Sequence, residues 1–218
     1  PGNPIKGQVW YNETANTLKV ESATTVGAWA TGGNANTGRQ EAGGNGTQTA
    51  ALIYGGRTAP QTGVTESYNG SAWTEVNDLN TGRSGVTGFG TQTAAIGAGG
   101  YQPTPPYTRA IVESWNGTSW TEVADLGTAR YNAAAAGTQT AGLFMGGRAG
   151  IPGPASTNTE SWNGSAWTEL NDLNTGRYNI GGDGTQTSSL AFGGTPPGSL
   201  AVTESWNGTS WTEVADLN

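Results

Sequence analysis

The chain has no cysteine and no histidine among its 218 residues. It therefore has no disulfide, thiolate metal ligand or cysteine nucleophile, and it lacks the commonest general base and metal ligand. Charge is scarce as well, because Asp, Glu, Lys and Arg make up only 11% of the residues, against roughly 25% in an average protein. No apolar run approaches the roughly 18 residues of a membrane-spanning helix, so we expect no membrane insertion. These absences point away from most enzymes, and we expect no cofactor and no metal.

The charge that is present is mostly negative. Sixteen Asp and Glu residues against nine Lys and Arg give a formal net charge of -7. Because nucleic acid and anionic membranes repel such a chain, we do not expect them as partners. Glycine (37 residues) and proline (10) are abundant, but nine Trp, seven Tyr and three Phe supply the apolar area for a packed core. The composition therefore predicts a folded, turn-rich protein rather than a disordered one.

A repeat of 44 to 47 residues runs through the sequence. The phrase Gly-Thr-Gln-Thr begins at Gly46, Gly90, Gly137 and Gly184, in steps of 44, 47 and 47 residues. Four arginines keep the same steps, and these are Arg39, Arg83, Arg130 and Arg177. The phrase Glu-Ser-Trp-Asn-Gly, with Tyr68 for the first Trp, recurs from Glu66, Glu113, Glu160 and Glu204. A period of this length is typical of propeller blades.

One copy of the repeat contains four predicted strands, at residues 131–136, 141–145, 159–162 and 166–170. Between the last two, Asn163-Gly164 predicts a type I′ hairpin turn, in which both central residues have positive φ. Four antiparallel strands repeated around an axis make a β-propeller, which is the all-β fold that we expect. Small residues should line the crowded axis, and the tryptophans should lie farther out.

The aromatic residues of each copy form a pair on one sheet face. Residues that lie opposite each other across a hairpin share a face, and each such pair can fill the space between neighbouring blades. The pairs are Tyr68 with Trp73, Trp115 with Trp120, Trp162 with Trp167, and Trp206 with Trp211. Trp29 occupies the outer-strand position of an earlier copy.

This pattern resembles the kelch repeat. An apolar strand ends in Gly-Gly at Leu143–Gly147, and Trp162, Trp167 and Arg177 follow at the places where kelch repeats have aromatic residues and an arginine. The resemblance extends over nearly everything from Glu21 onward. It implies a kelch-like β-propeller and leaves the function open, because propellers serve many unrelated functions.

The number of blades depends on the N-terminal residues. Five outer-strand tryptophans stand against four inner strand pairs, and residues 7–12, 17–22 and 28–32 supply three strands of a first blade. We therefore expect five blades, with residues 1–36 forming an incomplete first blade and residues 37–218 forming four kelch-like blades. The alternative is a propeller of four blades with a separate N-terminal hairpin.

The charged residues divide into those that repeat and those that do not. We expect the repeated ones to be structural, with carboxylates accepting hydrogen bonds from turn amides and each arginine pairing with an acid of the next blade. A ring of these arginines binding an anion is the alternative. The charges that do not repeat form no acid–base pair and have no His or Cys beside them, so we do not expect an enzyme. A glycan-cleaving enzyme is the less favoured alternative, since Ser114–Trp120 loosely resembles the Asp-box of sialidases, with Asn in place of Asp and one residue fewer.

The segments after each Gly-Gly differ from copy to copy. They comprise residues 57–64, 101–112, 148–158 and 195–202, and strand direction places all four on one face. Variable, proline-rich loops on a rigid scaffold are typical of binding proteins, although loops also vary without a function. Tyr and Arg are favoured at binding hot spots. The candidate ligand-binding residues are Arg57, Tyr101, Tyr107, Arg109 and Arg148.

A second resemblance involves the N-terminus. Gly7–Asn12, followed by Thr17–Val20, resembles a hairpin common in bacteriophage tail fibres and other virion proteins. This implies a recognition module at a virion surface or outside the cell. Its partners would be a host-surface glycan or protein, or neighbouring virion proteins, and an oligomer is compatible with it. A purely structural spacer or decoration protein of the virion is the alternative.

Overall fold

The computed structural model describes residues 9–12, 17–20, 32–196 and 198–217. The chain divides into two units, Pro1–Gly32 and Gly33–Asn218. In the N-terminal unit, β1 (Val9–Asn12) pairs antiparallel with β2 (Thr17–Val20). Two of the three strands predicted for this region are therefore present, over shorter ranges. Trp29 lies outside the described residues, as does nearly all of the third predicted strand.

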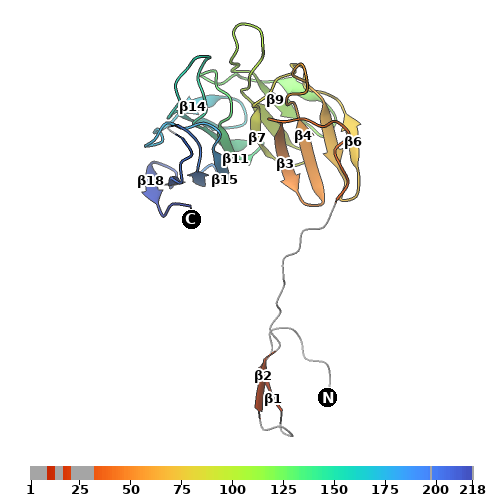
Figure 1. The fold of residues 1–218 in the computed structure, drawn as a ribbon, viewed down its shortest axis with the longest axis vertical. Helices are drawn as coiled ribbons and strands as arrows, with labels where there is room; N and C mark the ends of the chain where they lie inside the picture. The colour runs from red at the N-terminus through yellow and green to blue at the C-terminus, as the bar shows by residue number, and fades with distance from the viewer. Residues whose placement is uncertain (1–8, 13–16, 21–31, 197, 218) are drawn as a thin grey trace. The chain divides into compact units, whose positions relative to one another are not determined.

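The C-terminal unit contains four antiparallel sheets of four strands each, and no helix among its described residues (Figure 1). The first sheet is β3 (Gly43–Thr47), β4 (Ala50–Tyr54), β5 (Thr65–Tyr68) and β6 (Trp73–Val76). The second is β7 (Thr87–Gly90), β8 (Ala95–Ala98), β9 (Val112–Trp115) and β10 (Trp120–Glu122). The third is β11 (Ala134–Thr138), β12 (Ala141–Met145), β13 (Thr159–Trp162) and β14 (Trp167–Glu169). The fourth is β15 (Gly181–Thr185), β16 (Ser188–Phe192), β17 (Thr203–Trp206) and β18 (Trp211–Val214).

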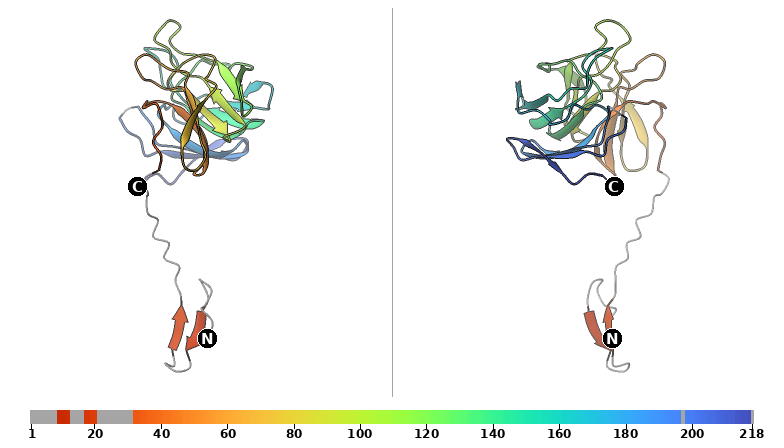
Figure 2. Two further views of the ribbon diagram at one scale, coloured as in Figure 1. Left: turned by 90° about the vertical axis from the view of Figure 1, so that its right-hand side faces the viewer. Right: turned by 60° about the vertical axis from the view of Figure 1, so that its left-hand side comes forward.

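The sheets are arranged as in a β-propeller. The first strand of each sheet lies next to the first strand of the following one, so that β3 neighbours β7, β7 neighbours β11, and β11 neighbours β15 (Figures 1 and 2). Small residues line these strands, as predicted. At Gly88 of β7 a Cβ atom would lie 1.8 Å from the carbonyl oxygen of Ile96, so only glycine fits there. The all-β, propeller-like arrangement of the unit is thus established.

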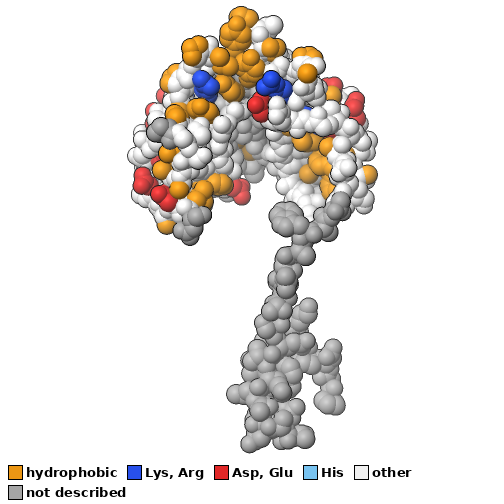
Figure 3. Space-filling model, viewed as in Figure 1, with side chains coloured by type: hydrophobic (Ala, Val, Ile, Leu, Met, Phe, Trp, Pro, Cys, Tyr) orange, Lys and Arg blue, Asp and Glu red, His pale blue; other side chains and the backbone are white. Residues whose placement is uncertain are grey.

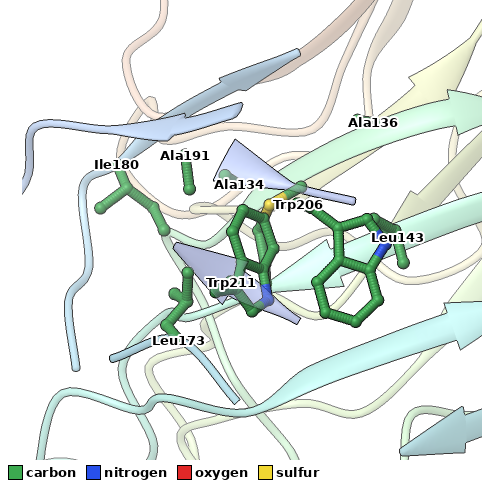
Figure 4. Close-up of a cluster of buried hydrophobic side chains, with 9 residues drawn as sticks. Ala134, Ala136, Leu143, Leu173, Ile180, Ala191, Trp206 and Trp211 are labelled. Carbon is green, nitrogen blue, oxygen red and sulfur yellow. The ribbon is translucent and has the colours of Figure 1, made fainter. Parts of the chain in front are cut away.

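Aromatic pairs fill the space between sheets. Trp115 and Trp120 are direct register partners, and their ring centroids are 5.3 Å apart. The Trp120 ring also lies 4.8 Å from that of Tyr54 in the preceding sheet, and its Nε1 donates to Thr65 Oγ1 at 3.1 Å. In Figure 4 the pair Trp206 and Trp211 packs in the same way against side chains of the preceding sheet. The pairs of the second, third and fourth sheets thus each pack against the preceding sheet.

The repeated glutamine of Gly-Thr-Gln-Thr joins each sheet to the one before it. Gln139 Nε2 donates to Trp115 O at 2.5 Å and to Ser114 Oγ at 3.0 Å. The indole Nε1 of Trp162 in turn donates to Gln139 O at 2.8 Å. In the sequence this phrase marks only the period of the repeat. Its function as a link between sheets depends on a neighbour that is distant in the sequence.

Each repeated arginine forms a buried ion pair. Arg130 Nη2 lies 2.6 Å from Glu160 Oε1, and Arg130 Nη1 donates to Gly146 O and Asn158 O at 2.6 and 2.7 Å. Burial lowers the pKa of Arg130, and the Glu160 carboxylate opposes this change. The equivalent pairs are Arg39–Glu66, Arg83–Glu113 and Arg177–Glu204. All four guanidinium groups are buried, which supports the structural role and leaves none of them open to an external anion. Each arginine pairs with the glutamate of its own repeat, so the prediction of a partner in the next blade is wrong.

The aspartates in the segments after the outer strands also serve the backbone. Asp78 Oδ1 accepts from Thr65 N at 3.1 Å, and Asp125 Oδ1 and Asp216 Oδ1 make the equivalent bonds. Asp172 Oδ2 instead accepts from the hydroxyl of Thr157 at 2.9 Å.

Two local predictions are wrong. Asn163 does not have the positive φ that a type I′ turn requires. Its side chain stabilises the turn instead, because Oδ1 accepts hydrogen bonds from the N–H groups of Ser165 and Ala166 at 3.0 and 2.9 Å. Only Gly164, at φ 94°, adopts the left-handed conformation. The inner strand expected at 131–136 begins at Ala134 instead. Tyr131 forms an isolated bridge with Arg148, and this bridge brings the variable loop against the inner strand.

The last sheet has an exposed apolar face. Leu79, Leu126 and Leu173 are 5%, 4% and 2% exposed, because each is covered by the following sheet. Leu217 occupies the same position of the repeat and is 52% exposed. Leu190 is 43% exposed, whereas its equivalents Leu52, Ile96 and Leu143 are buried. No described residues cover the fourth sheet as each of the first three is covered.

Candidate ligand-binding face

All four variable loops emerge at one end of the C-terminal unit. Isolated bridges join the start of each loop to a residue three positions before an inner strand: Gln40 with Arg57, Ser84 with Tyr101, Tyr131 with Arg148, and Tyr178 with Thr195. We call this end the loop face. It comprises the four loops (57–64, 101–112, 148–158 and 195–202) and the segments 39–42, 83–86, 130–133 and 177–180. The prediction that the loops share one face is confirmed, and the loop containing residues 101–112 projects at the top of Figure 1.

A pocket of about 330 Å³ opens among the segments that precede the inner strands. Its rim is formed by Glu41, Gly85, Asn132 and Asn179, one from each sheet, and all four have φ between 53° and 61°. The backbone N–H of each rim residue donates to the carbonyl of the rim residue before it: Gly85 to Glu41, Asn132 to Gly85, and Asn179 to Asn132, at 2.8 to 2.9 Å. The rim is therefore held by a continuous series of hydrogen bonds from sheet to sheet.

The side chains at the rim are polar. Asn132 Nδ2 donates to Asn179 Oδ1 at 2.7 Å, which joins the third and fourth sheets. Glu41 takes the left-handed conformation without being glycine or asparagine, and such strain is found at functional sites more often than elsewhere. This rim was not predicted from the sequence. Asn132 and Asn179 stand 47 residues apart, one period of the repeat, and that spacing was the available signal.

A second cavity, of about 230 Å³, lies among the inner strands themselves. Its walls come from β3, β7, β11 and β15, and they are mostly glycine backbone with the side chains of Asn45 and Asp183. Asp183 Oδ1 accepts from Gly184 N at 2.7 Å. The axis of the unit is therefore polar.

Tyrosines form a connected group on the loop face. Tyr101 and Tyr107 stack with an interplanar angle of 20° and centroids 6.4 Å apart. Tyr131, from the next sheet, lies 5.7 Å from Tyr101. Tyr107 is 39% exposed, while Tyr131 is buried, and burial raises its pKa. The group thus has an accessible end at Tyr107 and a fixed base at Tyr131.

Arg148 extends this group toward the fourth sheet. Its guanidinium lies 5.3 Å from the ring centroid of Tyr178, a cation–π contact, and its Nε donates to Gly153 O at 3.2 Å. Its backbone is bridged to Tyr131. Arg148 is half-buried, and its position is fixed by residues of two sheets.

The other two predicted arginines have different surroundings. Arg109 Nε donates to Gln102 Oε1 at 2.6 Å and its Nη2 to Thr104 O at 3.3 Å, so its side chain supports the longest loop from within. Arg57 is exposed, and its side chain makes no hydrogen bond or ion pair with the described residues. No aromatic or cation–π contact among the described residues joins Arg57 to the tyrosine group.

The structure therefore brings Tyr101, Tyr107 and Arg148 together, with Arg109 as support. It adds Tyr131 and Tyr178, which the sequence reading did not select. These two also stand 47 residues apart, and each directly precedes a rim asparagine. Figure 3 shows two separate basic patches on the upper part of the unit, near hydrophobic side chains, and one of them lies beside an acidic side chain.

Within the described ranges, no group of three or more Asp, Glu, His or Cys side chains is placed to hold a metal ion. The same part of the chain contains no helix with the length and apolarity that a membrane span requires. Comparisons with models of known protein families and with curated proteins gave no match.

Proposed function

We propose that this chain is a non-enzymatic recognition module. It presents the loop face to a glycan or protein of a host surface and acts at the surface of a virion, in the manner of a tail fibre. The scaffold and the loops differ sharply in their sequences. The sheets repeat nearly the same residues, whereas the four loops differ in sequence and vary in length from 8 to 12 residues. Variation confined to one end of a rigid scaffold favours recognition.

The observation that carries this proposal is the group of tyrosine and arginine side chains on the loop face. Tyr107, Tyr101 and Tyr131 are in contact, and Arg148 lies over Tyr178. Tyr provides a large contact area with few rotatable bonds, and Arg provides several hydrogen-bond donors in a fixed arrangement. Both are enriched at binding hot spots. The virion location rests on the resemblance of Gly7–Val20 to tail-fibre hairpins.

The test is binding of the purified chain to candidate host cells and to a glycan array. The double variant Tyr101→Ala, Tyr107→Ala is expected to lose binding by roughly tenfold or more. The matched control is Thr93→Ala, Thr140→Ala, which changes two exposed turn residues between inner strands, at the other end of the sheets. Equal binding by both variants would remove the proposed site. A chain that assembles on particles and binds no cell surface would instead favour a structural spacer or decoration protein.

We also propose a finer description of the fold, namely a kelch-type propeller of five blades in which residues 1–36 form the incomplete first blade. Two observations support it. The exposure of Leu217 and Leu190 leaves the last sheet without a covering neighbour. In addition, Trp73 Nε1 donates to Gly33 O at 3.1 Å, as Trp167 Nε1 donates to Ala124 O at 3.0 Å after a complete outer strand. Gly33 thus occupies the place of a residue that follows a fourth strand.

A further inference from the structure

Unpaired positive charge in the C-terminal unit is confined to the loop face. Its described residues include seven arginines and no lysine. Four of the arginines belong to the buried ion pairs inside the sheets. The remaining three are Arg57, Arg109 and Arg148, all in variable loops, and none of them forms an ion pair with a described residue. A chain with a net charge of -7 thus places its free cations at one end.

Most of the acids near this end already have partners. The repeated glutamates bind the buried arginines, and the aspartates of the connecting segments accept from backbone amides or a threonine hydroxyl. Glu41 is the acid that lines the pocket. It lies on the first sheet, whereas Arg148 lies in the loop of the third and contacts Tyr178 at the start of the fourth. The part of the loop face around Arg148 is therefore cationic and can bind an anionic group.

The surroundings of Arg148 supply the other contacts of a ligand. Its Nε donates to Gly153 O, and the Tyr131 hydroxyl lies against the guanidinium. The guanidinium forms no ion pair with a described residue, and its remaining N–H groups can bind a carboxylate. Asn132 and Asn179 of the pocket rim directly follow Tyr131 and Tyr178, the two tyrosines that Arg148 contacts, and the stacked pair of Tyr101 and Tyr107 offers a flat apolar surface.

We propose that the loop face binds an acidic saccharide, with the sugar carboxylate at Arg148. The ring of a neighbouring sugar lies against Tyr101 and Tyr107, and hydroxyl groups bond to Asn132, Asn179 and Glu41. This inference rests on the proposed recognition function and names its ligand class. An acidic peptide would satisfy the guanidinium as well. It carries few hydroxyl groups, however, for a rim of two amides and a carboxylate, so the saccharide fits the pocket better.

The test is calorimetric binding to oligosaccharides that bear glucuronate, galacturonate or sialate, each beside its carboxyl-reduced counterpart. At least one acidic member is expected to bind roughly tenfold more tightly than its reduced form, and its affinity is expected to fall with added salt. Arg148→Gln is expected to remove that difference, because the guanidinium that distinguishes the carboxylate from its reduced alcohol is gone. The control is Thr121→Glu, which makes the same change of net charge on the exposed outer strand β10.

The outcomes separate this inference from the function on which it rests. Equal affinity for acidic and reduced sugars, with binding still lost in Tyr101→Ala, Tyr107→Ala, would overturn the acidic preference and retain recognition. Arg148-dependent binding of a hexaglutamate peptide with no saccharide bound would overturn the saccharide class. Binding to no sugar, peptide or cell would overturn both proposals.

Discussion

Trp211 donates its indole Nε1–H to Oγ1 of Thr159 at 3.0 Å, across the boundary between the fourth and third sheets. Trp120 and Thr65 make the same bond between the second and first sheets, at 3.1 Å. Where the preceding sheet has no threonine at this position, as at Val112, the indole of Trp167 donates to the carbonyl of Ala124 instead. Each of these indole N–H groups thus has an acceptor across the sheet boundary. The residue at the position of Thr159 in the preceding sheet determines which acceptor it is.

Replacing Thr159 by valine should therefore weaken one boundary. Thr159→Val keeps the shape of the side chain and removes the acceptor of the buried Trp211 N–H, which would have to shift toward a backbone carbonyl as the N–H of Trp167 does beside Val112. The expected loss is about 1–3 kcal/mol of unfolding free energy. Urea denaturation monitored by tryptophan fluorescence measures it. Thr168→Val makes the same chemical change on the exposed strand β14 and should alter stability by less than about 0.5 kcal/mol. Equal effects of the two variants would contradict the assigned role.

Thr203 provides a test of the five-blade proposal. It occupies the position of Thr159 in the last sheet, and its buried Oγ1 has no partner among the described residues. If residues 1–36 form a first blade, Trp29 is the equivalent donor. We then expect Thr203→Val and Trp29→Phe to be coupled by about 0.5 kcal/mol or more in a double-mutant cycle of unfolding free energies. Additive effects, with Thr203→Val neutral or stabilising, would favour four blades and a separate hairpin.

The sheets were predictable from the sequence because their determinants are local. The spacing of Trp162 and Trp167 around a short turn defines which residues lie opposite each other, and the register confirms that pairing. The apolar strand 141–145 was also predicted with the bounds of β12. Alternation and turn residues encode such features within one repeat, so a single copy suffices to read them.

The pocket rim could not be predicted in this way, because it depends on contacts between repeats. The hydrogen bond from Asn132 to Asn179 joins residues 47 positions apart, and no local pattern marks either residue as a rim residue. The tyrosine group has the same origin, since Tyr101 meets Tyr131 only when the second and third sheets pack. Arg109 was selected from the sequence because arginines in variable loops are candidate binding residues. Its hydrogen bond to Gln102 could not be predicted, because that bond depends on the conformation of the loop.

The buried ion pair of Arg130 and Glu160 should contribute far more to stability than surface charge does. Glu160→Gln removes the charge that compensates a guanidinium with no access to solvent. Breaking such a pair costs about 3–5 kcal/mol. Glu169 is the register partner of Glu160 on the exposed outer strand, so Glu169→Gln is the matched control, with an expected change below about 0.5 kcal/mol. Urea unfolding of both variants decides the matter, and similar midpoints would show that the pair is not structural.

The buried hydroxyl of Tyr54 should make the protein less stable at alkaline pH. Its ring is buried between the first and second sheets, with the hydroxyl oxygen 2.5 Å from Asn45 Oδ1 and 3.2 Å from Ile96 O. Burial raises the pKa of Tyr54 well above the ordinary value of about 10, and the charge of Arg83 opposes this only in part.

Above about pH 10 the unfolded chain releases the proton of Tyr54 while the folded chain retains it, so stability falls as pH rises, by up to about 1.4 kcal/mol per pH unit. Tyr54→Phe removes this term. The difference in unfolding free energy between the wild type and Tyr54→Phe should therefore be constant from pH 7 to 9 and decrease from pH 10 to 11. Tyr107→Phe, at an exposed tyrosine, should show no such change. Urea unfolding at each pH measures these differences, and a Tyr54→Phe difference that stays constant up to pH 11 would rule out a raised pKa at this position.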